Sequence, residues 1–225
     1  MSAAPKTIPG AADRPFAFTA ENQAEAERLI AKYPEGRTRS AVLPLLDLAQ
    51  RQEGWVSRAV VEAVAKMAGV APIMVWEVAT FYTMYNLEPI GRFHIEVCTN
   101  LPCWLRGSED VVRAARDVFG VDIGQTSADG LVTLSQAECL GACVNAPMAQ
   151  IGDDYYEDLT YDRAKALFTA MKQGRTMHGG SQAGRRCSAP EGTLTTLTTD
   201  PTTPEGGRWI ADSSPAAPGA TADPR

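Results

Sequence analysis

The stretch Phe93-His-Ile-Glu-Val-Cys98-Thr-Asn-Leu-Pro-Cys103 decides how this chain is expected to fold. Apolar and polar residues alternate up to Cys98, which predicts a β-strand, and the loop after it carries a second cysteine. A second pair, Cys139 and Cys143, follows another apolar run, Leu131-Val-Thr-Leu134. The sequence therefore predicts two strands, each of which ends near a pair of thiols.

Paired thiols in loops rich in Gly, Pro, Asn and Thr most often hold a metal. The spacings, Cys98-x4-Cys103 and Cys139-x3-Cys143, differ from the C-x2-C knuckles of many zinc sites and favour a 2Fe-2S cluster, in which each iron takes two thiolates. Structural zinc and buried or disulfide-forming thiols remain open on spacing alone. A thiol redox enzyme is less favoured because the chain lacks C-x2-C. Electron transfer is the leading hypothesis.

Composition narrows the class of partner. The chain has 225 residues, 24.1 kDa and 44% apolar residues, enough for one or two compact domains. A net charge of -6 and a pI near 5.0 give no basic footprint for nucleic acid or anionic lipid, which favours a protein or small-molecule partner. No apolar run approaches the ~20 residues of a membrane span. With no signal or transit pattern at the start, we expect reduced thiols in a cytoplasmic setting.

Upstream of the first strand, the pattern is helical. Residues 16–89 are predicted to form a small helical bundle, with helices over 20–32, 40–52, 58–67 and 73–85. Thr19 and Ser57 are the predicted caps, and Pro44 is compatible with its helix only in the first turn. The aromatic stripe of residues 78–85 is interpreted as helix packing, ahead of a cofactor wall or a docking surface.

Downstream, residues 90–174 are predicted to form a domain of order β-α-β-β-β-α. Its helices are expected over 105–119 and 161–172, and its hairpin within 148–156. Residues 1–15 are expected to be flexible, and residues 175–225 to form a disordered Pro/Thr/Gly-rich tail. The predicted fold class is α+β, a helical bundle followed by an α/β domain.

Other candidate side chains are given no ligand or catalytic role. Cys187 lies in the predicted tail as a bystander thiol, and His94 and His178 are assigned to ordinary surface or packing roles. The acidic run is interpreted as a solvated turn, with a weaker hypothesis that it lowers the potential of a nearby cluster. The run comprises Asp153, Asp154, Glu157 and Asp158. The usual dinucleotide and P-loop fingerprints are absent from the sequence.

Three motifs together resemble a known family. They are Cys98-Thr-Asn-Leu-Pro-Cys103, Glu138-Cys-Leu-Gly-Ala-Cys-Val-Asn-Ala-Pro-Met148 and Asp153-Asp-Tyr-Tyr-Glu-Asp-Leu159. Upstream, Gln52-Glu-Gly-Trp-Val56 and Val78-Ala-Thr-Phe-Tyr-Thr-Met84 look like helical-domain motifs of the same family. The chain resembles the thioredoxin-like 2Fe-2S subunit of NADH:quinone oxidoreductase, respiratory complex I, over roughly residues 17–173.

The resemblance implies a thioredoxin-like domain behind the bundle, with Cys98, Cys103, Cys139 and Cys143 as the ligands of one 2Fe-2S cluster. It implies docking on a flavoprotein subunit that binds NADH and FMN, beside other peripheral-arm subunits of complex I, and exchange of one electron with that FMN. The chain would then be an oxidoreductase subunit without a complete active site. Its place would be the cytoplasmic side of the inner membrane in a bacterium, or the matrix side in a mitochondrion.

Three alternatives remain beside this interpretation. The same motifs occur in the diaphorase subunit of an NAD-linked hydrogenase or formate dehydrogenase. A stand-alone thioredoxin-like ferredoxin is less favoured because the helical preface suggests a docking module. A zinc-stabilised scaffold without redox function is the third.

Overall fold

The computed structural model describes residues 15–175 and 177–190, and these fall into two compact units that meet in the chain between Ile90 and Gly91. The division lies one residue from the predicted boundary at 89 and 90. The flexible start predicted for residues 1–14 and the tail predicted for residues 191–225 lie outside the described residues.

The first unit is helical, as predicted. Its elements are α1 (Ala20–Ala31), a 3-10 turn η1 (Thr38–Ala41), α2 (Val42–Glu53), α3 (Arg58–Ala68) and α4 (Pro72–Phe81). The predicted caps are confirmed, because Thr19 accepts the N–H of Asn22 and Ser57 accepts the N–H of Val60. Pro44 lies in the first turn of α2, where a missing N–H costs no helical hydrogen bond.

The core of this unit is built from small and branched apolar side chains on α2, α3 and α4. Its fully buried members include Leu45, Leu46, Val60, Val64 and Val75. Tyr85 also lies in this core, and its hydroxyl donates to the Leu43 carbonyl at 2.9 Å.

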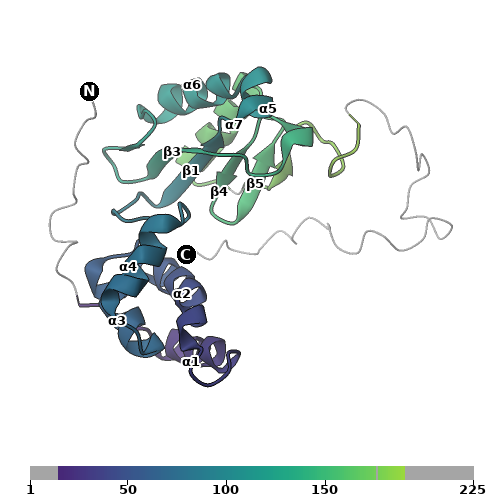
Figure 1. Ribbon diagram of the computed structural model, residues 1–225. Helices are drawn as coiled ribbons and strands as arrows, with labels where there is room; N and C mark the ends of the chain where they lie inside the picture. Colours follow the sequence, from purple (N-terminus) through teal and green to yellow (C-terminus); the bar gives the residue numbers. More distant parts are fainter. Residues whose placement is uncertain (1–14, 176, 191–225) are drawn as a thin grey trace. The chain divides into compact units, whose positions relative to one another are not determined.

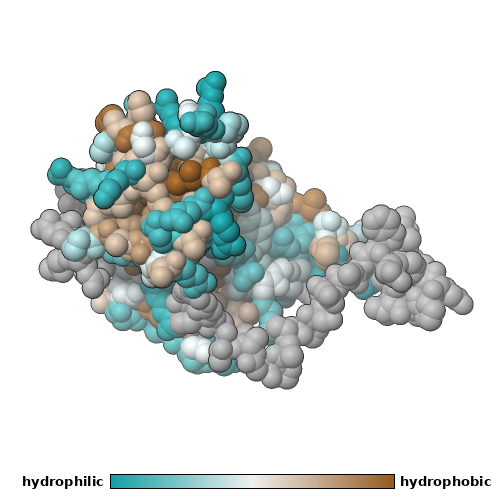
Figure 2. Space-filling view, turned by 90° about the horizontal axis from the view of Figure 1, so that it is seen from below, coloured by the Kyte–Doolittle hydropathy of each residue, from teal (hydrophilic) through white to brown (hydrophobic). Residues whose placement is uncertain are grey.

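The predicted fourth helix is too long. The helix α4 ends at Phe81, and Tyr82 is extended, so the stripe of residues 78–85 is not one helical face. Phe81 is 74% exposed and Met84 49% exposed, whereas Ala79 and Tyr85 are buried. The packing interpretation is therefore wrong for Phe81 and Met84, which form part of the apolar surface of the bundle. Figure 2 shows such apolar side chains reaching the surface among polar ones.

The second unit contains a mixed six-stranded sheet in the order β2-β3-β1-β4-β5-β6. Its strands are β1 (Phe93–Cys98), β2 (Gln125–Thr126), β3 (Val132–Ala137), β4 (Ala149–Ile151), β5 (Asp154–Glu157) and β6 (Gly180–Ser181). Its helices are α5 (Leu101–Leu105), α6 (Ser108–Phe119), the 3-10 turn η2 (Cys143–Asn145) and α7 (Tyr161–Lys172). Figure 1 shows α6 and α7 beside these strands.

The parallel pair β1 and β3 sets the register of the site. Phe93 lies opposite Val132 and Cys98 opposite Ala137. The approach to β1 requires a glycine, because a Cβ on Gly91 would lie 2.8 Å from the Val132 carbonyl carbon. On the core side, α6 and α7 pack together through Phe119 and Phe168, whose ring centroids are 5.8 Å apart.

The α+β class and the order β-α-β-β-β-α are confirmed, with three differences. The helix expected over 105–119 is broken at Gly107, whose φ of 94° ends α5 before α6 begins. The short strand β2 was not predicted. The tail was predicted to begin at residue 175, which is wrong for residues 177–190, because β6 pairs in parallel with β5.

Among the described residues, no single helix is long and apolar enough to cross a membrane. The consecutive helices α3 and α4 together pass the same test of length and composition, with a bend of 119° between them.

Candidate metal centre

The four cysteines predicted as ligands lie on two loops at one edge of the sheet. Cys98 ends β1 and Cys103 follows on α5, while Cys139 comes after β3 and Cys143 begins η2. Neighbouring parallel strands end at the same edge, so the pairing of β1 with β3 brings the two loops together.

Hydrogen bonds join the two loops directly. The Thr99 amide donates to the Ala137 carbonyl at 3.3 Å, and the Asn100 side-chain amide donates to the Glu138 carboxylate at 2.9 Å. Each of these residues lies within two positions of a cysteine. The loops are therefore held to each other by the protein itself.

The two thiol pairs differ in exposure. Cys98 and Cys103 are 2% and 1% exposed and pack with Ala146 and Met148, whereas Cys139 and Cys143 are exposed. All four are free thiols, and the sulfurs of Cys139 and Cys143 lie 3.5 Å apart. Two thiolates on one tetrahedral metal with bonds of ~2.3 Å are ~3.7 Å apart, so this pair is already close to the spacing of a chelate.

Comparison with known proteins identifies the family. The chain matches the thioredoxin-like 2Fe-2S ferredoxin family over residues 26–172, about two thirds of its length. It belongs to this family. The match covers most of the helical unit as well as all four cysteines.

Curated relatives agree on one complex. The chain is 54% identical over 158 residues to the E subunit of the NADH-quinone oxidoreductase of Rickettsia conorii, covering 70% of this chain and 95% of the relative. It is 45% identical over 185 residues to the mitochondrial NADH dehydrogenase (ubiquinone) flavoprotein 2 of Dictyostelium discoideum, covering 81% of this chain and 75% of the relative.

Among solved structures, a chain of an NAD⁺-reducing [NiFe]-hydrogenase shares the fold. The TM-score is 0.53 at 20% identity, over 59% of this chain and 23% of that chain. This likeness concerns the fold alone.

The donor set fits the 2Fe-2S cluster that characterises the family. Four thiols on two short loops would supply two sulfurs for each of two irons. Within residues 15–175 and 177–190, no three His, Cys, Asp or Glu side chains are grouped to hold one metal ion as they stand. The four cysteines fit a 2Fe-2S cluster because they provide the right number of sulfurs and because the two loops that carry them are joined by hydrogen bonds.

Burial controls the protonation of the inner pair. Desolvation raises the pKa of the Cys103 thiol to about 12, and the hydrogen bond with Cys98 adds to the increase. The Met148 backbone acts in the opposite direction and lowers the pKa of Cys103, which favours the thiolate. In the second loop, the hydrogen bond with Cys139 raises the pKa of Cys143. Metal binding must therefore displace protons from these sulfurs.

Exposed apolar side chains lie in the two segments that carry the cysteines. Leu101, Trp104 and Leu105 on α5 are 61%, 53% and 69% exposed, and Val144, which follows Cys143, is 66% exposed. These residues belong to the same segments as the thiols. Such an apolar rim is typical of a surface that contacts another protein.

The histidines stay apart from these loops. Burial lowers the pKa of His94, and its ring lies 2.7 Å from the Ser135 hydroxyl. His178 is exposed. The thiol of Cys187 is exposed too, but its backbone carbonyl accepts a hydrogen bond from the Asn145 side chain at 2.9 Å.

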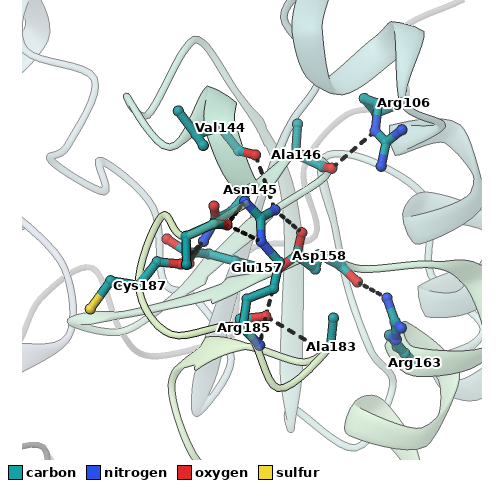
Figure 3. Close-up of polar contacts among 12 residues, drawn as sticks. Arg106, Val144, Asn145, Ala146, Glu157, Asp158, Arg163, Ala183, Arg185 and Cys187 are labelled. Atoms are coloured by element: carbon teal, nitrogen blue, oxygen red, sulfur yellow. Dashed lines mark hydrogen bonds and ion pairs between the residues drawn. The ribbon is translucent and has the colours of Figure 1, made fainter. Parts of the chain in front are cut away.

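The acidic run was predicted to be a solvated turn, and only its first half, the exposed Asp153 and Asp154, agrees with that. Asp158 is 6% exposed and pairs with Arg185 at 2.9 Å, and Glu157 accepts from the Asn145 side chain at 2.6 Å. Figure 3 shows these side chains converging beside Val144 and Ala146. The solvated-turn interpretation is therefore wrong for Glu157 and Asp158.

Sequence reasoning missed Arg185 and Asn145. Asn145 carried a weak signal, since it lies in the motif after Cys143. Arg185 carried none, because its partners are the Asp158 carboxylate and the Val144 carbonyl, both distant in sequence, and the Ala189 carbonyl in its own segment.

Proposed function

We propose that Cys98, Cys103, Cys139 and Cys143 ligate one 2Fe-2S cluster, and that the chain transfers single electrons as the E-type subunit of an NADH-quinone oxidoreductase. The arrangement of four reduced thiols on two joined loops at one sheet edge carries this proposal. Identities of 45–54% to subunits named for that complex support it.

A bound cluster supplies reversible one-electron chemistry. The chain supplies four sulfurs, burial of the inner pair, and the Met148 backbone, which favours the Cys103 thiolate. A group that favours the thiolate stabilises added negative charge, whereas burial opposes it, so the Met148 backbone and burial would act on the potential in opposite directions. The outer pair is exposed, which gives a partner a short path to the site.

The proposed electron partner is the FMN of a flavoprotein subunit that binds NADH. The apolar rim formed by Leu101, Trp104, Leu105 and Val144 supports docking of a protein at the cysteine loops. In a bacterium the complex would hold this chain on the cytoplasmic side of the inner membrane, and in a mitochondrion on the matrix side.

The cluster and the docking are tested separately. Anaerobically purified protein should contain two irons and two acid-labile sulfides per chain and give one EPR signal after reduction by dithionite. With the flavoprotein partner added, NADH should reduce the site by one electron. Protein with one zinc and no sulfide would refute the cluster proposal.

Docking at the cysteine loops is tested by Leu105→Gln. The matched control is Ile123→Gln, which changes another exposed apolar residue, 42% exposed, outside the cysteine loops. Both variants should keep the cluster, since exposed substitutions rarely affect folding. Leu105→Gln should weaken partner-dependent reduction while Ile123→Gln leaves it unchanged. Equal rates of partner-dependent reduction in the two variants would show that the apolar rim is not part of the docking surface.

An NAD-linked hydrogenase or formate dehydrogenase remains the second candidate, because a hydrogenase chain shares the fold. Identification of the subunits that co-purify with the chain distinguishes the parent complexes. A chain that purifies alone and exchanges electrons with soluble carriers would instead act as a free ferredoxin.

A further inference from the structure

The segment of residues 177–190 returns to the loop that carries Cys143. It contains β6, which pairs with β5 so that Gly180 lies opposite Tyr156. The Gln182 amide then donates to the Glu157 carbonyl at 2.9 Å. This segment, called the strap below, is thus fastened to the sheet immediately before it reaches the site in Figure 3.

Arg185 of the strap contacts three separate parts of the chain. Its Nη1 donates to Asp158 at 2.9 Å and to the Val144 carbonyl at 3.2 Å. Its Nε and Nη2 both donate to the Ala189 carbonyl, at 2.8 and 2.6 Å. The planar guanidinium therefore fixes the residue after Cys143 to the start of the turn before α7 and to the end of the strap.

Asn145 forms the second connection, two positions after Cys143. Its side chain donates to Glu157 at 2.6 Å and to the Cys187 carbonyl at 2.9 Å, and its own carbonyl accepts the Asp158 amide at 2.8 Å. Asn145 is 3% exposed. The cluster loop and the strap thus share one set of hydrogen bonds around the buried Asn145.

This set is built around a buried ion pair. The side chains of Arg185 and Asp158 are 9% and 5% exposed, and Asp158 also accepts from the Ser181 hydroxyl at 2.5 Å. A lysine would keep the charge of Arg185, but its single ammonium group could not reproduce the hydrogen bonds that the planar guanidinium donates to three acceptors. Loss of either partner would leave an uncompensated charge beside the cluster loop.

We propose that Arg185 is a positioning residue for the cluster, holding the backbone after Cys143 through Val144 and neutralising Asp158. The strap is then part of the cluster-binding unit, contrary to the expectation that these residues belong to a disordered tail. The proposal rests on the ligand role proposed for Cys143.

The test compares Arg185→Gln, Asp158→Asn and Arg186→Gln in the full chain. Arg186 is the matched control because it is the next residue, has the same side chain and is exposed. The measured quantities are the EPR spectrum, the midpoint potential and the rate at which a chelator removes iron. Arg185→Gln leaves a buried negative charge, so the potential should fall; Asp158→Asn leaves a positive charge, so the potential should rise. Iron loss should accelerate about a hundredfold or more in both.

Shifts of the midpoint potential in opposite directions would distinguish an effect of the buried charge from a general destabilisation of the fold. Shifts of the same sign, or an Arg185→Gln protein indistinguishable from Arg186→Gln in all three measurements, would overturn the proposal. If Arg185→Gln does not accumulate as folded protein, Arg185→Lys replaces it. That variant keeps the charge but loses hydrogen bonds, so its EPR spectrum should change, and an unchanged spectrum would overturn the positioning role.

Failure of the ligand assignment can be recognised independently. If the unaltered protein holds no cluster, the proposed function fails. Hydrogen exchange of the Val144 to Ala146 amides in cluster-free protein then still measures whether Arg185 holds this loop. Exchange equal in the unaltered protein and in Arg185→Gln would refute that hold.

Discussion

Truncation at two positions separates the strap from the rest of the C-terminal sequence. A chain ending at Pro190 keeps every described residue, whereas a chain ending at Gly174 loses β6 and Arg185. The shorter chain leaves Asp158 without the guanidinium and without the Ser181 hydroxyl. The two truncations therefore differ by residues 175–190, which include β6 and the network around Asp158.

The size of the effect follows from that network. Removing one partner of a buried ion pair costs ~3–5 kcal/mol. At ~1.4 kcal/mol per factor of ten, the open population of the second unit rises between about 150-fold and several thousandfold. Domains of this size are stable by only about 5–15 kcal/mol, so the loss is a large part of the total.

Hydrogen exchange of the amides in β1 and β3 is the appropriate assay, since these strands belong to the second unit alone. The protection of these amides should fall in the chain ending at Gly174 and stay at the full-length value in the chain ending at Pro190. Iron retention against a chelator should follow the same order. Equal protection and equal iron retention in the two chains would refute the reasoning.

Three further substitutions test other parts of the account. Phe168→Ala leaves a cavity at a fully buried position and should lower the free energy of unfolding by ~3–5 kcal/mol, as measured by hydrogen exchange of core amides. The control Leu105→Ala, at an exposed position, should lower it by under ~0.5 kcal/mol. A loss below ~1 kcal/mol for Phe168→Ala would contradict the packing. Burial lowers the pKa of His94, so the unfolded chain binds more protons than the folded chain, and the free energy of unfolding falls as the pH drops below about 6.5. Urea unfolding from pH 8 to 5 should show this decline, and the decline should be smaller in His94→Gln. An identical pH profile in the variant would contradict the role of His94. Tyr85→Phe removes the hydrogen bond to Leu43 and should cost ~1 kcal/mol in the exchange of α2 amides, whereas no change would show that bond to be energetically neutral.

Local chemistry made much of the fold predictable. Thr19 and Ser57 cap their helices because a hydroxyl can accept an orphan N–H, and this depends on the next few residues only. The alternation ending at Cys98 and the apolar run before Cys139 likewise predicted the strands that deliver the thiols.

The errors occurred where distant contacts or a single backbone angle decide the structure. Gly107 breaks the helix expected over 105–119 by its positive φ, which helical periodicity does not reveal. Phe81 belongs to the apolar stripe of the sequence and was therefore expected to be buried. It is exposed, and α4 ends at this residue.

The strap was predicted to be part of a disordered tail because it is polar. A prediction from composition depends on apolar content, which the strap lacks. Arg185 is buried through one carboxylate and backbone carbonyls, and such contacts leave no periodic pattern. The cysteine loops were predictable by contrast, since four thiols at short spacings have few chemical uses.

The most direct test of the central claim is the iron and acid-labile sulfide content, with the EPR spectrum, of Cys139→Ser beside Cys187→Ser. Both cysteines are exposed, so the pair controls for loss of a surface thiol. The account predicts that Cys187→Ser keeps two irons, two sulfides and the native signal, while Cys139→Ser loses cluster or gives an altered signal. A native signal at full occupancy in Cys139→Ser would contradict the ligand assignment.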